Sequence, residues 1–139
     1  MADGLGFTYA EAKTILQTEF TENTYIGLSS TIPAKDGSNV TELSAALGYK
    51  RAKFGKRDAD QKKGQIANAE IIFFFVALGN CGSATHLAMY KDDDSVVPFF
   101  TAKLENPMSI GENYVPLIRE YKLIIGLDID TLDTTYTAR

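Results

Sequence analysis

Hydrophobic residues near the N-terminus recur with the spacing of one face of a helix. The apolar positions are Tyr9, Ala12, Ile15, Leu16 and Phe20. Residues three and four positions apart share one side of an α-helix, so this spacing predicts a helix over residues 8–20. Thr8 and Glu11 have the spacing of a capping box, with Thr8 as the N-cap. A helix this short is marginal alone in water, so we expect its apolar face to dock on the rest of the protein or on a neighbouring subunit.

Beyond residue 20, short apolar runs alternate with turn residues, a pattern typical of β structure. The runs predict strands at residues 25–29, 48–54, 66–78, 85–90, 96–104, 114–118 and 122–130. The turn and loop signals fall at residues 36–37, 55–65, 79–83, 91–95, 106–107 and 110–113. Residues 71–78 are apolar throughout, which predicts that the strand around them is buried on both faces.

The last run has the clearest alternation of apolar and polar residues. Leu123, Ile125, Leu127 and Ile129 alternate with Lys122, Gly126, Asp128 and Asp130, and Ile124 is the one apolar exception. A period of two is typical of a strand with one face in the core and one face in water. We therefore expect the four apolar side chains in the core, followed by a loose tail over residues 131–139.

Six or seven short strands, frequent turns and one helix predict a mainly β fold. We expect an antiparallel β-sandwich of jelly-roll, immunoglobulin-like or small-barrel type. A parallel α/β sheet is disfavoured because the crossover helices are missing. The length of 139 residues suggests one domain, with the helix at 8–20, the sandwich at 24–130 and the tail at 131–139.

Composition adds expectations about the compartment. The longest apolar run has far fewer than the roughly 20 residues of a transmembrane helix, and the N-terminus lacks the pattern of a signal peptide. A single cysteine, Cys81, cannot form an internal disulfide. We therefore expect synthesis in a cytoplasm and no contact with a membrane.

Charge is distributed unevenly along the sequence. The net charge is −4. Residues 50–63 hold seven basic and two acidic residues, a local charge of +5, so the remainder carries −9. This asymmetry predicts a contact between subunits, in which a basic loop meets a neighbour's acidic turn. The candidate contact residues are Lys53, Lys56, Arg57, Lys62 and Lys63 in the loop, and Asp92, Asp93 and Asp94 in the turn.

Candidate reactive or metal-binding residues do not form a catalytic pattern. Cys81 and His86 are five residues apart across a turn, with nothing in the sequence that would pair the thiol with the imidazole. Structural zinc needs about four such ligands. The acidic turn could ligate calcium, but consecutive aspartates point in different directions, so an exposed hairpin turn is favoured. The basic segment has few interleaved aromatic residues, which disfavours nucleic acid. We expect no enzyme activity, no cofactor and no metal.

Several segments, taken in order, resemble a family of small tailed-phage virion proteins usually described as tail-fibre proteins. The matching segments are Tyr25-Ile26-Gly27-Leu28, Pro33 with Asp36-Gly37, Val40-Thr41-Glu42, Gly48-Tyr49-Lys50-Arg51, Ile66-Ala67-Asn68, Cys81-Gly82-Ser83-Ala84-Thr85-His86, Leu104-Glu105-Asn106-Pro107 with Gly111, and Leu123-Ile124-Ile125-Gly126-Leu127. The resemblance spans residues 8–130. Two features depart from it, because Cys81 stands where tryptophan is expected and the segment 50–63 is unusually rich in lysine.

The resemblance implies a structural protein of the phage particle, of the tail-fibre or tail-tip type. Its expected role is virion assembly or host-surface contact, as a homo-oligomer with a trimer as first choice. Other virion proteins and a host-surface glycan are the further expected partners. The alternatives are a capsid-bound decoration or head-fibre protein and a carbohydrate-binding module. The latter would need exposed aromatic rings, for which the candidates are Tyr49, Tyr90, Phe99 and Tyr114.

Overall fold

The computed structural model describes residues 8–59, 64–127 and 134–137 of the chain. In chain order the elements are α1 (Tyr9–Glu19), β1 (Tyr25–Ser29), the 3₁₀ helix η1 (Ala45–Leu47), β2 (Ala52–Lys53), β3 (Arg57–Asp58), β4 (Gln65–Asn68), β5 (Ile72–Phe73), β6 (Gly82–Tyr90), β7 (Phe100–Ile110), β8 (Leu117–Ile118), β9 (Ile124–Leu127) and β10 (Thr134–Thr137). Among the described residues, no helix is long and apolar enough to cross a membrane.

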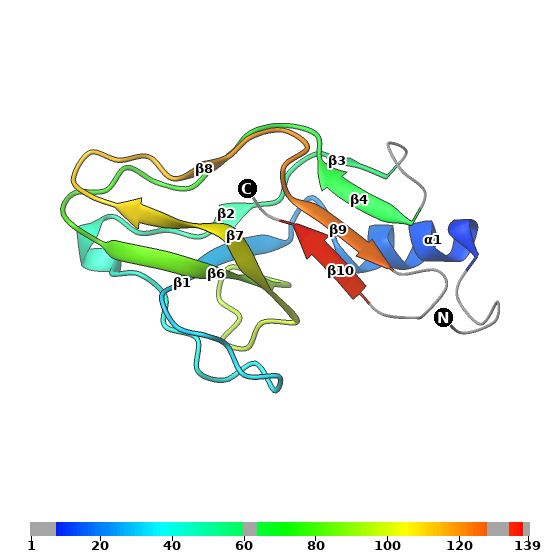
Figure 1. Ribbon diagram of the computed structural model, residues 1–139, viewed down its shortest axis with the longest axis horizontal. Coiled ribbons are helices and arrows are strands. Elements are labelled where there is room, and N and C mark those ends of the chain that lie inside the picture. The colour runs from blue at the N-terminus through cyan, green and yellow to red at the C-terminus, as the bar shows by residue number, and fades with distance from the viewer. Residues whose placement is uncertain (1–7, 60–63, 128–133, 138–139) are drawn as a thin grey trace.

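The strands pair in three sheets within the described part of the chain. The first sheet has the order β2-β1-β6-β7, the second has the order β10-β9-β4-β3, and β5 pairs with β8. Every pairing is antiparallel. Figure 1 shows the first sheet on the left and the second on the right, where α1 packs against β4 and β9. The predicted mainly β, antiparallel fold with one N-terminal helix is confirmed, and the arrangement is compatible with a β-sandwich.

The N-terminal helix forms as the sequence predicts. Thr8 is the N-cap, and its hydroxyl oxygen accepts a hydrogen bond from the backbone N–H of Glu11 at 3.2 Å. The buried face consists of Ala12, Leu16 and Phe20, while Tyr9 is exposed and Ile15 is half-buried. The Phe20 ring lies 5.1 Å from the Phe100 ring and 6.4 Å from the Phe54 ring, measured between centroids. The helix therefore docks on the protein's own core, although through fewer residues than the spacing suggested.

The prediction of one long buried strand over residues 66–78 is wrong. The segment forms β4, which ends at Asn68, and β5, which begins only at Ile72. The Asn68 side chain is buried and donates to the carbonyls of Glu70 and Arg119, both at 2.9 Å. Its Oδ1 accepts the backbone N–H of Leu123 at 3.0 Å. These bonds to a distant part of the chain turn the strand aside, so that part of the apolar run after Asn68 faces solvent.

Several strand boundaries also differ from the predictions. Residues 48–54 contribute only β2, because η1 and the left-handed Gly48 (φ +94°) precede it. The predicted loop at residues 106–107 lies inside β7. Pro107 lies in the irregular stretch of β7 between the pairs Ala84–Met108 and His86–Lys103, where the register shifts and proline is tolerated. The expected loose tail does not hold for Thr134–Thr137, which pair with β9 as β10.

The alternating run near the end of the sequence contributes to the core as far as the structure describes it. Leu123 and Ile125 are almost completely buried, which confirms their predicted position. The side chain of Leu127 and all of Ile129 lie outside the described residues. One cluster of buried apolar side chains joins α1 to strands of all three sheets.

Candidate functional site

A hydrogen-bonded network surrounds the carboxylate of Glu42 beside the first sheet. Arg51 donates from Nε to Oε1 and from Nη2 to Oε2 of Glu42, both at 2.9 Å. Tyr49 donates its hydroxyl to Glu42 Oε1 and accepts the backbone N–H of Leu28 at 3.0 Å. A two-pronged contact between arginine and carboxylate fixes both groups in one geometry. The network therefore ties residues 42–51 to β1.

The protonation of this network follows from its surroundings. Burial alone pushes the pKa of Glu42 up, but the hydrogen bonds from Arg51 and Tyr49 outweigh burial and hold the pKa below its ordinary value. Burial and the hydrogen bond to Glu42 raise the pKa of Tyr49, which keeps the phenol protonated. A Cβ at Gly27 would lie 2.6 Å from the Glu42 carboxylate, so this position in β1 requires glycine. The network braces the sheet and presents no reactive group.

Arg51 also joins the network to the acidic turn between β6 and β7. Its Nη1 donates to the carbonyl of Asp93 at 2.7 Å, and its guanidinium carbon lies 3.5 Å from the centroid of the Tyr90 ring. Asp92, Asp93 and Asp94 are exposed. Within the residues that the structure describes, no three His, Cys, Asp or Glu side chains are grouped to hold a metal ion. An arginine of the basic segment thus holds the turn by a backbone carbonyl, not by its carboxylates.

Arg57, the one arginine among the predicted contact residues, is bound within its own chain. Its Nη1 donates to the carbonyls of Gln17 at 2.9 Å and of Phe20 at 2.8 Å, at the C-terminal end of α1. A cation there satisfies carbonyls that lack partners in the helix and complements the negative end of the helix dipole. Arg57 therefore has a structural role in docking α1.

The lysines of the basic segment are less constrained. Lys53 and Lys56 are exposed, and the Lys53 ammonium lies 5.8 Å from the centroid of the Tyr25 ring. Lys62 and Lys63 lie outside the described residues. A contact between copies through these lysines stays a prediction.

Two of the four aromatic residues predicted to lie on the surface are buried. Tyr49 and Tyr90 are almost completely covered because they pack into the network around Arg51, so their prediction as surface aromatics is wrong. Phe99 is half-buried, and Tyr114 is exposed. The four rings therefore do not form one exposed platform for a sugar.

Cys81 and His86 each interact with a neighbour in the sequence. The Cys81 Sγ lies 3.6 Å from the carbonyl oxygen of Gly79, and His86 Nδ1 lies 2.8 Å from the hydroxyl of Thr85. Burial and the positive charge of Lys103, its cross-strand partner, lower the pKa of His86. These contacts place neither group as the base or nucleophile of the other.

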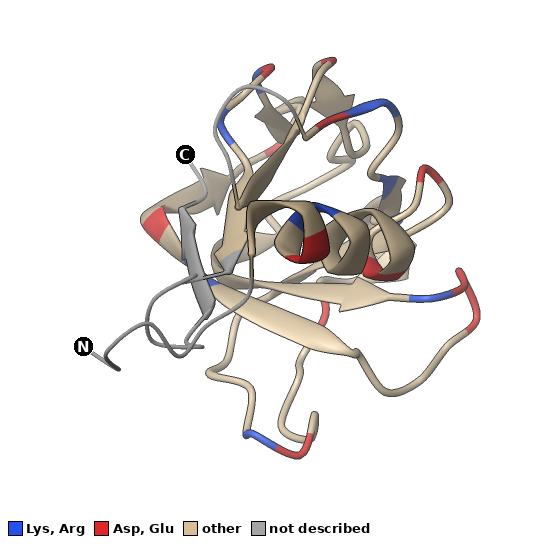
Figure 2. Ribbon diagram, turned by 90° about the vertical axis from the view of Figure 1, so that its right-hand side faces the viewer, with Lys and Arg blue, Asp and Glu red and all other residues tan. Residues whose placement is uncertain are grey.

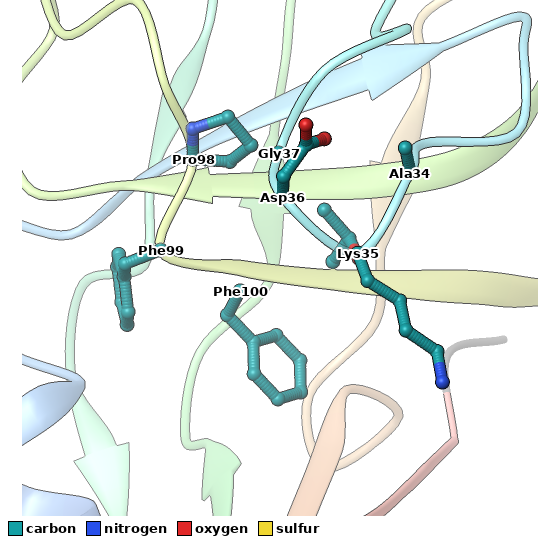
Figure 3. A pocket seen from close by; sticks show the side chains of 8 residues that line it. Ala34, Lys35, Asp36, Gly37, Pro98, Phe99 and Phe100 are labelled. Carbon is teal, nitrogen blue, oxygen red and sulfur yellow. The ribbon is translucent and has the colours of Figure 1, made fainter.

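A small hollow opens between the loop after β1 and the start of β7. Its volume is about 120 Å³, and Figure 3 shows residues of both segments around it. The lining residues are Ala34, Lys35, Asp36, Gly37, Pro98, Phe99, Phe100 and Thr101. The predicted turn is present, with Gly37 at φ +85°, and a Cβ there would lie 2.8 Å from a methyl group of Val97. The two loops therefore contact each other beside the hollow.

These loops, residues 30–40 and 91–99, are called the loop pair below. Figure 1 shows them projecting together from one side of the first sheet. Ile32, Val96 and Val97 are exposed on the loop pair. Neither this apolar projection nor the pairing of Glu42 with Arg51 was predicted from the sequence. The signal for the projection was available, because Ile32 and Val97 each precede a proline in a turn region, whereas nothing local marks Glu42 as a partner of Arg51.

These features define a class: a mainly β protein whose polar side chains stabilise the fold and whose outward features suit contact with other molecules. A comparison of the sequence with known protein families identifies the class more specifically. Residues 12–125 match the family described as Podophage GP4 fiber I protein gp80, so the chain belongs to this family of phage fibre proteins. The predicted resemblance is thereby confirmed, and the protein is a structural, virion-associated component. A comparison with curated proteins gives no match.

Proposed function

We propose that this protein is a subunit of the tail fibre or tail tip, where it assembles with copies of itself and with other virion proteins and contacts the host surface. The observation that carries the proposal is the match to a fibre family over residues 12–125, which extends from α1 into β9. A closed ring of identical subunits is the usual form of such assemblies, and a trimer is the first expectation.

The internal geometry supports a role in binding instead of chemistry. The Glu42 carboxylate is bound by Arg51 and Tyr49, and the imidazole of His86 is engaged with Thr85. Against the effect of burial, hydrogen bonds from Arg51 and Tyr49 lower the pKa of Glu42, and burial together with the bond to Glu42 raises the pKa of Tyr49, so both shifts arise from the packing of the fold. Such groups hold a surface in shape, which is what a fibre subunit requires.

The loop pair supports host-surface contact. Val96, within the loop pair, is 87% exposed. Loops on a rigid scaffold commonly carry binding residues, and exposed apolar side chains on them mark contact sites. The hollow beside Phe99 is the feature that favours a glycan as the bound molecule.

Immunogold labelling tests the location of the protein. Antibodies raised against the folded protein should place gold on the tails of intact particles, and particles lacking the gene serve as the control. Gold on the capsids would instead support the decoration or head-fibre alternative.

Adsorption of particles to host cells tests the loop pair. Particles carrying both Val96→Ser and Val97→Ser should contain the protein in normal amounts but adsorb roughly tenfold more slowly, because contact residues are lost. Thr18→Ala, on the exposed side of α1, is the control and should adsorb normally. Normal adsorption by the double variant would contradict the assignment of host contact to this projection.

A further inference from the structure

The apolar run that predicted a buried strand presents a row of exposed side chains. Phe73 is 61% exposed, Val76 55% and Leu78 65%, and Tyr114 on the adjoining segment is 46% exposed. On the inner side of the same segment, Ile72 pairs with Ile118 and both are buried. Both faces of this segment are therefore apolar, although only one is covered.

The segments around this row carry no charged side chain. Residues 44–49, 71–83, 107–111 and 113–118 contain no Lys, Arg, Asp or Glu. We call these four segments the uncharged end. Glu112, which is exposed, is the one charged residue between the last two of these segments.

Backbone hydrogen bonds gather the four segments in space. Leu78 N–H donates to the carbonyl of Leu47 at 2.9 Å, and Ala77 N–H donates to that of Tyr114 at 3.0 Å. Cys81 N–H donates to the carbonyl of Ile110 at 2.8 Å. Figure 1 shows η1, the start of β6, the end of β7 and the segment before β8 together at the left of the molecule.

The absence of charge from these segments narrows the choice of partner. Nucleic acid is bound through Lys and Arg that neutralise phosphates, and these segments have neither. A strongly charged protein or lipid surface would lose hydration here without gaining an opposite charge. The partner must itself present an apolar, uncharged surface.

A second copy of this chain meets that requirement. Each copy carries a net charge of −4, so two copies repel each other at long range. Contact through the uncharged end keeps the charged side chains of both copies apart and covers apolar surface with apolar surface. This contact does not require any ion pair to lose its water.

We propose that the uncharged end is the surface through which copies of this chain contact one another. The inference rests on the proposed function only in that a fibre is built from repeated subunits. Phe73, Val76 and Leu78 are the central contact residues.

Sedimentation equilibrium of the full-length protein tests the contact. Val76→Glu should weaken self-association at least roughly tenfold, because a carboxylate would be buried without a partner. Thr18→Glu adds the same charge on the exposed side of α1, away from the uncharged end, and should leave self-association unchanged. Leu78→Ser removes apolar area without adding charge, and it should also weaken association. The thermal unfolding of dilute samples shows whether each variant is folded.

Salt provides a second readout. Between about 0.1 M and about 1 M NaCl the screening length falls from about 10 Å to about 3 Å. The dissociation constant of the wild type should stay constant or fall over this range. A dissociation constant that rises steeply with salt, association by Val76→Glu and Leu78→Ser at wild-type strength, or a monomeric wild type would each overturn the inference. Gold labelling of tails tests the proposed function in a separate experiment, so the proposed function can hold or fail independently of these results.

Discussion

The uncharged end and the rest of the described molecule are stabilised in different ways. At the uncharged end, apolar side chains pack around β5 and β8, and backbone hydrogen bonds join the segments. Around α1, charged side chains make the connections: Lys91 donates to the carboxylate of Glu19 at 2.6 Å, and Arg57 donates to carbonyls of the helix. Figure 2, viewed from the side on which α1 lies, shows charged residues on the helix and on the loops around it.

This difference changes how the charge pattern should be interpreted. Along the sequence the contrast is one of sign, between a basic segment and an acidic remainder. In the fold, Arg51 of the basic segment binds the carboxylate of Glu42 and a backbone carbonyl of the acidic turn. The basic segment and the acidic remainder therefore contact each other within one chain. The contrast that remains at the surface is between charged and uncharged regions.

The largest expected effect on stability comes from comparing a buried with an exposed side chain at the uncharged end. Ile118→Ala removes a fully buried side chain and should lower the free energy of unfolding by about 2–5 kcal/mol. Phe73→Ala, on the outward face of the paired strand, should cost less than about 1 kcal/mol in dilute, monomeric samples. Urea unfolding measures both. Equal losses would show that Phe73 is part of the core of a single chain.

The next effect concerns the polar network. Arg51→Met leaves the Glu42 carboxylate with fewer partners and should cost about 2 kcal/mol. A fully buried pair would cost more, but the Glu42 side chain is 25% exposed. The double variant with Glu42→Gln should recover part of the loss, because no carboxylate then lacks its partner. If Arg51→Met alone were as stable as the wild type, the network would fix the positions of its side chains without adding net stability.

A smaller effect should appear as a dependence on pH. The pKa of Glu42 is lower in the folded protein than its ordinary value of 4.5, so the ionised form is stabilised by folding. This contribution is present above pH 4.5 and is lost as the pH falls through the folded pKa. Unfolding measured at a series of acidic pH values should show a shallower loss of stability for Glu42→Gln than for the wild type. Identical slopes would show that other carboxyl groups determine the acid response.

The smallest effect on stability is expected for the exposed lysines. Replacing Lys53 and Lys56 with Gln should change the free energy of unfolding by less than about 0.5 kcal/mol. The variant is more acidic, so its association should be severalfold slower at low salt and equal to the wild type near 1 M, as stopped-flow light scattering can measure. An unchanged rate at low salt would show that these lysines are only solvated surface.

The accuracy of the sequence predictions follows the distance between interacting residues. The helix cap depends on Thr8 and Glu11, which are three residues apart, and the turn at Gly37 closes on Ala34. Both were predictable because each is satisfied by its neighbours. The break at Asn68 depends on Arg119, which is 51 residues away, and no local pattern contains that information.

The same reason accounts for the errors in the candidate site. Tyr49 and Tyr90 were predicted to lie on the surface, but both are buried because they pack into the network around Glu42 and Arg51. Exposure of Phe73 is the opposite case, in which an apolar residue stays outside. Hydrophobicity alone predicts burial within one chain, and an exposed apolar surface, which we propose contacts a second copy, departs from that rule.

The packing of α1 on β9 determines when folding can be completed during synthesis. Leu16 and Phe20 leave the ribosome long before Ile124–Leu127, the strand that helps to cover the helix. At translation rates of roughly 5–20 residues per second, the interval is on the order of ten seconds. During that interval the helix can pack on earlier segments such as Phe54 and β4, but the part of its surface that β9 covers stays open, and a nascent neighbour on the same messenger can reach it. Folding of this protein is therefore completed only after its late strands emerge, and a chaperone that shields the first twenty residues would protect it during translation.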